Sequence, residues 1–306
     1  MLISKKKEMG GNAALLLAAI IWGASFVAQD VGKDHVGAFT YNGLRMLMGV
    51  AVLLPLILFM QLKKRKTDTR TKEQKKKDNF VQAKSGIVCG IILFCASKLQ
   101  QFAFNYIDEA ASGKIGFFTA LYMLLVPVFG LFLGQKQRFV VWVAVLMGCA
   151  GAYLLCVDSS LTLGFGELLA LGCAAFFAVH ILYIDSVMDK GDGVILSCSQ
   201  FFVVGILSVI CMFIFETPTI TGIRGALVPM LYSGIMSSGA GYTLQIVGQK
   251  YTKPAVASLL MCLESVFAVL TEWIVQGEQL EVREFIGCVV MFVAIIITNL
   301  PERKKK

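Results

Sequence analysis

Ten apolar stretches, each about long enough to cross a lipid bilayer, fill this chain of 306 residues almost from end to end. The hydrocarbon core of a bilayer is about 30 Å thick, so a spanning helix needs roughly 20 mainly apolar residues. Hydrophobic residues make up 57% of the sequence and charged residues 16%, a balance that would expose too much apolar surface in water. The sequence therefore predicts an all-α polytopic membrane protein with ten transmembrane helices, at residues 9–29, 35–62, 85–107, 115–135, 139–157, 166–188, 193–215, 226–249, 254–275 and 284–300.

The basic residues gather on one side of the predicted membrane. When the connections are counted alternately, 22 of the 28 Lys and Arg residues fall on the side of both termini, and three on the other side. Ten of the 22 lie in the connection 63–84. Because basic connections stay in the cytoplasm, we expect a multi-pass protein of the cell (plasma) membrane with both termini cytoplasmic. Contact with anionic lipid explains the basic connection better than nucleic-acid binding.

The residue types that enzymes and metal sites need are scarce. All nine cysteines fall inside predicted helices, and no CxxC or His/Cys cluster suggests a metal or a disulfide framework. The two histidines, His35 and His180, are predicted on opposite halves of the bilayer. No HExxH, GxSxG or Walker A motif is present. We therefore expect no catalytic activity, no cofactor and no ATP-driven pumping by this chain alone.

The chain divides near residues 158–164 into two similar halves of five predicted spans each. Ala111 aligns with Ala255 at an offset of 144, and Gly134 aligns with Gly277 at an offset of 143. Because each half has an odd number of spans, the second half enters the membrane from the side opposite to the first. Inverted repeats of this kind are typical of secondary transporters, whose substrate site lies near the midplane between the repeats.

Ionisable residues inside the predicted spans point to the interior of the bundle, because each is costly at bilayer depth unless it is paired or hydrated. Glu264 and Lys98 fall near the midplane and predict either a cavity lining or a static internal salt bridge. Arg45 is interpreted as structural, and Lys114 either faces the cavity or snorkels toward the outer surface. His180 fits an interhelical hydrogen bond better than a proton relay.

Other polar and aromatic side chains recur at helical spacing, so that several of them share one face of a predicted helix. Trp22, Ser25, Phe26 and Gln29 share one face of the first predicted helix, and Lys98 and Gln101 share a face of the third. The first, third, fourth, sixth, eighth and ninth helices are predicted to line a transport path, whereas the fifth and tenth are almost wholly apolar and predicted to be peripheral. The candidate residues of this path are Trp22, Lys98, Gln101, Lys114, Tyr122, His180, Tyr242, Gln245 and Glu264.

Four motifs in order resemble the EamA-type branch of the drug/metabolite transporter superfamily. They are IIWGASFVAQ in the first span, YNGLRMLMG in the second, the segment from LQQFAFNYIDEAA to LLVPVFG across the third and fourth, and SLLMCLESVFAVLTEW in the ninth. The resemblance covers the whole chain and implies two inverted EamA-type repeats, 9–157 and 164–300, with the basic connection 63–84 and a basic tail 301–306. The two halves differ at one aligned position, where Gln135 stands opposite Glu278.

The resemblance implies a secondary transporter, commonly an exporter, of a small polar metabolite. A site with Lys98 or Lys114, Glu264 and several aromatic rings would suit an amino acid or a related zwitterion. A proton is a candidate coupling ion, and we expect a monomer that interacts with the lipid bilayer. A channel or facilitator is the alternative, followed by a membrane enzyme.

The orientation can be tested by cysteine labelling. In a variant without the nine native cysteines, Arg70→Cys should be shielded from a membrane-impermeant maleimide in intact cells and should react after permeabilisation, because the basic connection is predicted to be cytoplasmic. Arg224→Cys, on the side predicted to face outward, is the matched control and should react in intact cells. Labelling of position 70 from outside intact cells would contradict the predicted orientation.

Overall fold

The computed structural model describes residues 5–65, 71–107, 111–156, 164–277 and 281–298, and every regular element among them is a helix. Helices α1 (Lys5–Lys33), α2 (Ala38–Arg65), α3 (Lys72–Ala103), α4 (Ala111–Ala120), α5 (Tyr122–Phe132) and α6 (Phe139–Cys156) form the first half. The second half contains α7 (Phe165–Val187), α8 (Gly193–Phe215), the short α9 (Ile220–Gly225), α10 (Leu227–Leu231), η2 (Tyr232–Tyr242), α11 (Thr243–Gln249), α12 (Pro254–Met261), α13 (Glu264–Gln276) and α14 (Val282–Thr298). A 3₁₀ turn, Met188–Lys190, links α7 to α8.

All ten predicted spans are helical in the described part of the chain. Seven segments are long and apolar enough to cross a membrane as they stand, with α4–α5 and α12–α13 each counted as one segment. The shorter α6, the run from α10 through η2 to α11, and α14 supply the other three. The prediction of a polytopic all-α membrane protein is confirmed.

The basic connection 63–84 is mostly helical rather than a loop. Helix α2 continues to Arg65, and α3 begins at Lys72, where Thr71 and Gln74 form a reciprocal capping box. At 1.5 Å per residue the 32 residues of α3 extend about 48 Å, well beyond the hydrocarbon core. The lysine-rich first turns of α3 therefore lie outside the core. The predicted basic tail 301–306 lies outside the described residues.

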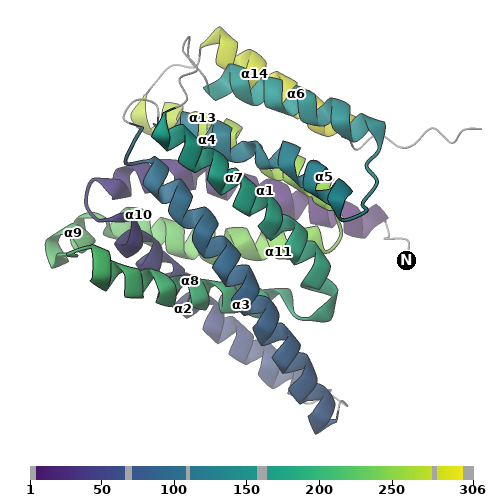
Figure 1. Cartoon of the computed structure of the whole chain (residues 1–306), viewed down its shortest axis with the longest axis vertical. Helices are drawn as coiled ribbons and strands as arrows, with labels where there is room; N and C mark the ends of the chain where they lie inside the picture. The colour runs from purple at the N-terminus through teal and green to yellow at the C-terminus, as the bar shows by residue number, and fades with distance from the viewer. Residues whose placement is uncertain (1–4, 66–70, 108–110, 157–163, 278–280, 299–306) are drawn as a thin grey trace, which may run out of the picture.

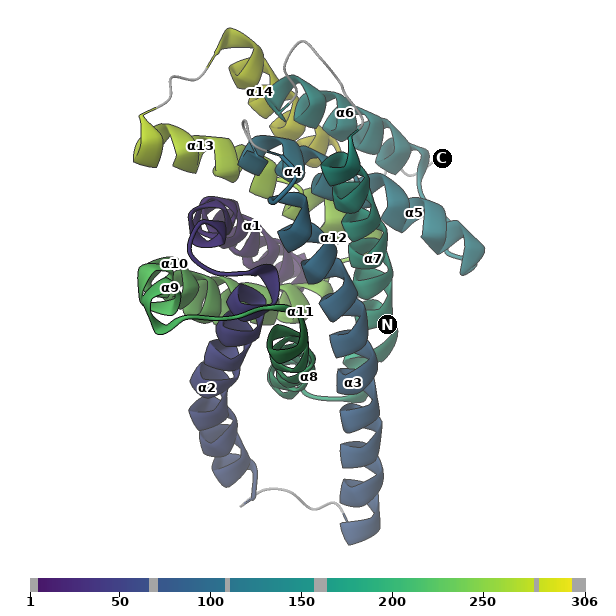
Figure 2. The same ribbon diagram turned by 60° about the vertical axis from the view of Figure 1, so that its left-hand side comes forward.

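The packing of the helices has the pattern expected of two repeats related by a twofold axis. Helix α1 packs on α12 and α13 as α7 packs on α4 and α5, and α1 packs on η2 and α11 as α7 packs on α3. Two further contacts join equivalent elements of the two halves, α2 with α8 and α6 with α14, and the contact of α4 with α13 has its counterpart in that of α12 with α5. In Figures 1 and 2, α6 and α14 lie side by side at one edge of the bundle, apart from α2 and α8.

Two features appear at equivalent places in both halves. Gly134 and Gly277 follow α5 and α13 with φ angles of 76° and 77°, a left-handed conformation that ends a helix and that glycine adopts without strain. The helix is also interrupted in both halves: at Leu121, between α4 and α5, and at Cys262–Leu263, between α12 and α13. Each interruption contains i→i+3 hydrogen bonds, such as Leu124 to Leu121 and Ser265 to Cys262. Tyr122 and Glu264 each begin the helical segment after the break.

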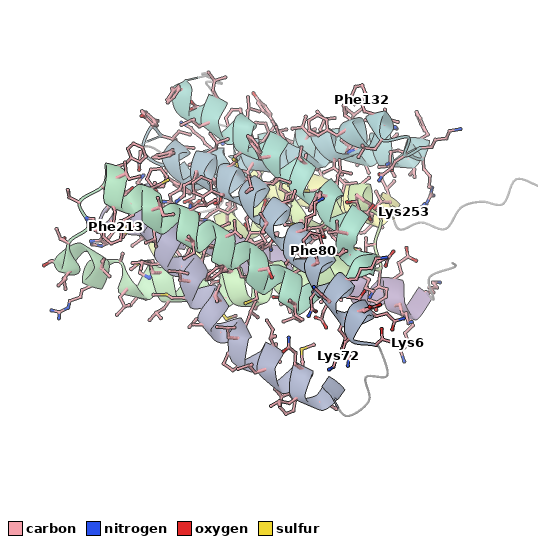
Figure 3. All side chains as sticks on the ribbon, turned by 60° about the horizontal axis from the view of Figure 1, so that its bottom comes forward. Lys6, Lys72, Phe80, Phe132, Phe213 and Lys253 are labelled. Atoms are coloured by element: carbon pink, nitrogen blue, oxygen red, sulfur yellow. The ribbon has the colours of Figure 1, made fainter. Side chains whose placement is uncertain are left out.

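The labelled lysines gather at one end of the bundle. Figure 3 shows Lys6, Lys72 and Lys253 toward one end, and Phe213, near the end of α8, at the other. The arrangement follows from the alternating direction of the spans, which brings the starts of α1, α3 and α12 to the same side. We call this the basic end and the opposite one the Phe213 end.

The contact between α6 and α14 depends on two facing glycines. A Cβ atom built at Gly287 would lie 2.6 Å from the carbonyl oxygen of Gly151, and one built at Gly151 would lie 2.9 Å from that of Gly287. Both distances are too short for ordinary contact, and the obstructing atoms belong to rigid helical backbone. Small residues allow helices to approach closely in membranes, where no hydrophobic effect drives them together.

We therefore expect Gly287→Ala to lower stability by about 1–3 kcal/mol, because the methyl group overpacks the α6–α14 contact. Gly10→Ala is the matched control: no atom would approach its Cβ within 4 Å, and alanine favours a helix by roughly 0.5–1 kcal/mol. Thermal unfolding of the purified proteins in one detergent would measure both. Equal unfolding temperatures for the Gly287→Ala protein and the wild type would show that the contact tolerates the methyl group.

Candidate functional site

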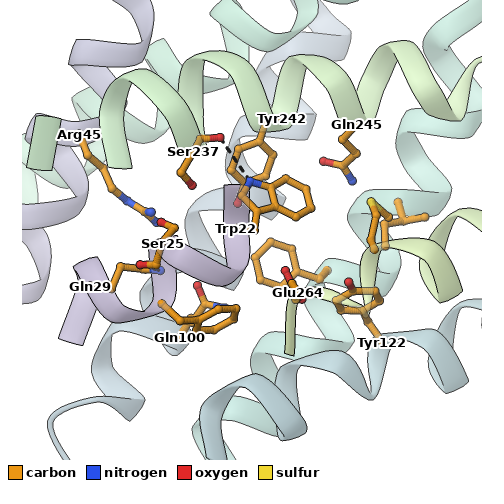
Figure 4. Close-up of a pocket in the computed structure, with 14 residues that line it drawn as sticks. Trp22, Ser25, Gln29, Arg45, Gln100, Tyr122, Ser237, Tyr242, Gln245 and Glu264 are labelled. Carbon is orange, nitrogen blue, oxygen red and sulfur yellow. Dashed lines mark hydrogen bonds between the residues drawn. The ribbon is translucent and has the colours of Figure 1, made fainter. Parts of the chain in front are cut away.

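A narrow central cavity lies between the two halves of the bundle. The space not filled by protein atoms is about 450 Å³, counting space open to solvent, and residues from α1, α2, α3, α5, α7, η2, α11, α12 and α13 line it. Helices α6 and α14 contribute no residue to its lining. Its lining residues, most of which Figure 4 labels, are Trp22, Ser25, Phe26, Gln29, Arg45, Gln100, Tyr122, Phe177, Ile181, Ser237, Tyr242, Gln245, Met261 and Glu264.

One wall of the cavity is the polar and aromatic face of α1. All four residues that share this face by helical spacing, Trp22, Ser25, Phe26 and Gln29, line the cavity. The indole Nε1 of Trp22 donates to the carbonyl of Ser237, at 3.3 Å, and the Trp22 ring lies 4.8 Å from the ring of Tyr242 between centroids. Both partners belong to η2, an 11-residue π-helix. Such widened turns are rare and frequently occur at functional sites.

Tyr122 and Glu264, which directly follow the two helix interruptions, both line the cavity. Each is the first residue of the helix that follows its interruption, and both side chains are buried. Within the described part of the chain, neither the Tyr122 hydroxyl nor Oε1 of Glu264 has a hydrogen-bond partner of good geometry, although the two groups are close enough to interact electrostatically. A buried carboxyl oxygen without a partner is costly, and in a cavity it is available to a ligand or a proton.

Five of the nine predicted site residues line the cavity: Trp22, Tyr122, Tyr242, Gln245 and Glu264. The other four, Lys98, Gln101, Lys114 and His180, do not belong to its lining. His180 is fully buried, and its Nε2 is 2.9 Å from the Gln200 side-chain oxygen, with the ring against Tyr242. Gln101 is buried, whereas Lys114 is half-buried near the start of α4.

Lys98 is held at the start of α2 rather than in the cavity. Its ammonium donates to the carbonyl of Ala38 at 3.0 Å and lies 4.6 Å from the centre of the Phe39 ring and 5.7 Å from that of Phe94. No ion pair joins it to Glu264 among the residues that the structure describes. The Lys98–Glu264 salt bridge considered from the sequence is therefore not present among these residues. The Lys98 ammonium is hydrogen-bonded to a backbone carbonyl instead.

On two helices the predicted face is rotated by one residue. Gln100 lines the cavity instead of Gln101, and on α7 Phe177 and Ile181 do so instead of His180. One residue turns a helix by about 100°, which moves a side chain from a cavity to a neighbouring helix. Arg45, interpreted from the sequence as structural, is also a lining residue.

Glu216 was not among the predicted site residues, yet it fixes the start of α2. It follows α8, and its carboxylate accepts hydrogen bonds from the backbone N–H groups of Phe39 and Thr40 at 2.7 and 2.8 Å, and from the Thr40 hydroxyl at 2.7 Å. A carboxylate at a helix N-terminus satisfies free N–H groups and complements the helix dipole. The only sequence signal is an acid that directly follows an apolar span.

Toward the basic end, a larger hollow of about 2750 Å³, counting space open to solvent, lies between α2, α3, α8 and α11. In Figure 2, α2 and α3 diverge toward this end. Ile246 lines the hollow and also belongs to an apolar cluster with Cys89, Ile184 and Leu196, whereas the adjacent Gln245 lines the central cavity. The hollow and the cavity are therefore lined by adjacent residues of α11.

Ten helical segments in two halves that pack alike surround a central polar cavity, an arrangement typical of transporters built from inverted repeats. The chain belongs to the EamA-like transporter family, which matches residues 9–157 and 164–300. The protein is accordingly a multi-pass membrane protein of a transporter family. The family and the names of its relatives indicate transport rather than catalysis.

The relatives are similar along almost their whole length. An uncharacterized transporter of Archaeoglobus fulgidus is 26% identical, with 96% of this chain and 87% of the relative covered. The uncharacterized transporters YoaV and YwfM of Bacillus subtilis are 21% and 23% identical, with 95% of this chain covered in each case and 97% and 94% of the relatives. A protein of known crystal structure has the same fold, with a TM-score of 0.75 at 19% identity over 94% of this chain and 96% of that one.

The role of Glu216 can be tested by its removal. We expect Glu216→Ala to lower stability by about 1–3 kcal/mol, because the two partly buried backbone amides at the start of α2 lose their acceptor. Glu8→Ala, which changes an exposed acid in the first turn of α1, should stay within about 0.5 kcal/mol of the wild type. Thermal unfolding in detergent compares the two, and an equal small loss for both would show that Glu216 does not hold α2.

Proposed function

We propose that this protein is a secondary transporter that moves a small polar metabolite through the central cavity by alternating access between its two repeats. The observation that carries the proposal is Glu264: a buried carboxylate at a helix interruption, lining a cavity between the halves, with one oxygen unpartnered among the described residues. Discontinuous helices at the midplane form substrate and ion sites in transporters of inverted-repeat architecture. The proposed transport path comprises Trp22, Tyr122, Tyr242, Gln245 and Glu264, together with Arg45.

The two ends of the bundle differ in how they are closed. At the Phe213 end, Glu216 and Lys98 tie α8 and α3 to the start of α2, and the Lys33 ammonium donates to the Phe104 carbonyl at 3.1 Å. At the basic end, the large hollow is lined by Ile246, next in sequence to Gln245, which lines the central cavity. If the basic end is cytoplasmic in the plasma membrane, as we propose, the hollow opens toward the cytoplasm. That arrangement supports uptake of solute from the cytoplasm and its export.

An amino acid or a related zwitterion is the solute class that this site favours. Glu264 offers a counter-charge for an ammonium group, and Trp22, Phe26, Phe177 and Tyr242 offer aromatic surface to an apolar side chain. Proteoliposomes loaded with unlabelled amino acids would test the proposal by counterflow of the radiolabelled compounds. Saturable flux with counterflow is expected for a carrier, whereas flux that never saturates and shows no counterflow would indicate a channel.

Glu264→Gln should depress transport on the order of tenfold or more, because a charge-assisted interaction of roughly 1.5–3 kcal/mol is lost while the side chain keeps its size. Glu272→Gln, two turns further along α13 and only half-buried, is the matched control and should transport at a rate near that of the wild type. Wild-type rates in a well-folded Glu264→Gln protein would show that the carboxylate is only structural.

The same variant separates two roles for Glu264. If Glu264 carries a proton in antiport, Glu264→Gln loses flux driven by a pH gradient and keeps solute exchange. If Glu264 is the counter-charge for a substrate ammonium group, the variant loses both. Measuring exchange and gradient-driven flux on the same vesicles decides between the two roles.

A further inference from the structure

Arg45 is the only cationic side chain among the residues that line the central cavity, and its charge is not neutralised by the protein around it. The residue is 2% exposed. Its Nε donates to Oδ1 of Asn42 at 2.6 Å, and its guanidinium lies 5.9 Å from the centre of the Tyr41 ring. Within the described part of the chain, its two terminal nitrogens make no hydrogen bond, and no acidic side chain lies within ion-pair distance.

The position of Arg45 is fixed from a second helix. Asn42, one turn earlier on α2, donates through Nδ2 to the carbonyl of Ser97 on α3 at 3.0 Å. The asparagine thus accepts from the guanidinium with one atom and anchors to α3 with the other. Because Nε is engaged by Asn42, the rotation of the guanidinium is restricted and the terminal nitrogens are the groups left for a ligand.

A buried arginine without a counter-charge is expensive, more so at bilayer depth, and the cost falls when an anion binds to it. The planar guanidinium matches a carboxylate, which it can bind through two parallel hydrogen bonds. Lys98 cannot supply this contact as placed, since its ammonium is engaged by Ala38 and two aromatic rings away from the lining. Ser25 and Gln29 line the same cavity as Arg45, and the Gln29 Oε1 has no partner among the described residues.

We propose that Arg45 is the anion-recognising residue of the central cavity, that Asn42 positions it, and that the transported solute carries a carboxylate bound by the two terminal nitrogens. In Figure 4, Arg45, Ser25 and Gln29 lie on one side of the Trp22 ring, with Glu264 and Tyr122 on the other. The carboxylate of the solute therefore binds on the Arg45 side and its hydrogen-bond donors on the Glu264 side. This inference rests on the proposed transport function and names the chemical group by which the site selects its substrate.

The test compares carboxylates with their amides on the purified full-length protein. The probes are the standard amino acids and short mono- and dicarboxylic acids, each paired with its uncharged amide, and the readout is ligand-induced thermal stabilisation in detergent. We expect at least one carboxylate to stabilise the wild type while its amide does not. In Arg45→Gln, the affinity for that carboxylate should fall ~10- to 100-fold, the loss expected for a charge-assisted hydrogen-bonded pair.

Three further variants keep the inference independent of folding. Arg45→Lys retains the charge without the planar pair of donors and should give an intermediate affinity. Asn42→Ala should weaken binding of the carboxylate, because the guanidinium loses the hydrogen bond that positions it. Lys98→Met removes a buried cation outside the cavity lining and should keep the preference for the carboxylate over its amide.

Two results would overturn the inference. One is the failure of every carboxylate to stabilise the wild type more than its amide does. The other is an unchanged affinity for the carboxylate in a monodisperse Arg45→Gln protein. Counterflow of amides or amines by such a protein would leave the proposed transport function standing while the role of Arg45 fails. Absence of counterflow by the wild type, with carboxylate stabilisation present and dependent on Arg45, would instead remove the transport function and leave the binding role intact.

Discussion

A polar group can remain at bilayer depth only where protein or trapped water surrounds it, and the arrangement of this bundle follows from that constraint. Apolar side chains face outward on α6, α14, α8 and the far part of α2, and the buried polar groups are enclosed between the two halves. The enclosed groups fall into two sets. One set, around Glu216 and Lys98, has its hydrogen bonds satisfied by backbone groups at the start of α2. The other, around Arg45 and Glu264, does not.

The difference between the two sets separates architecture from function. The Glu216 carboxylate accepts three hydrogen bonds from the start of α2. These bonds fix its geometry and leave few lone pairs free for a ligand. The Glu264 Oε1, the Gln29 Oε1 and the Tyr122 hydroxyl are buried in the cavity lining without such partners among the described residues. Other buried polar atoms of the described residues also lack partners, but these three line the cavity, where a bound solute can supply the missing hydrogen bond.

The repeat supplies a symmetric frame, and the residues placed on it make the site asymmetric. The helix breaks after Ala120 and Met261, and the left-handed glycines 134 and 277, occupy matching positions in the two halves. At the first residue after each break, however, one half carries a tyrosine and the other a glutamate. A twofold frame with one acid on one side and one arginine contributed by α2 can orient a dipolar solute, which a strictly symmetric cavity could not do.

The sequence alone determined the ten spans, their division into two halves and which residues share the polar and aromatic face of α1. Hydrophobic length and helical periodicity are local properties, so they can be read without the tertiary structure. The pairing of Gly134 with Gly277 was also readable, since a helix end that needs a left-handed residue leaves a glycine in both repeats. Tertiary structure alone decided that Gln100 rather than Gln101 faces the cavity, that Arg45 lines it, and that Lys98 turns to the Ala38 carbonyl. These outcomes depend on the rotation of each helix against neighbours distant in the chain, and a rotation of about 100° separates adjacent residues. The sequence could not reveal the hydrogen-bond partners of Glu216 either. They become its partners only where the end of α8 meets the start of α2 in the folded protein.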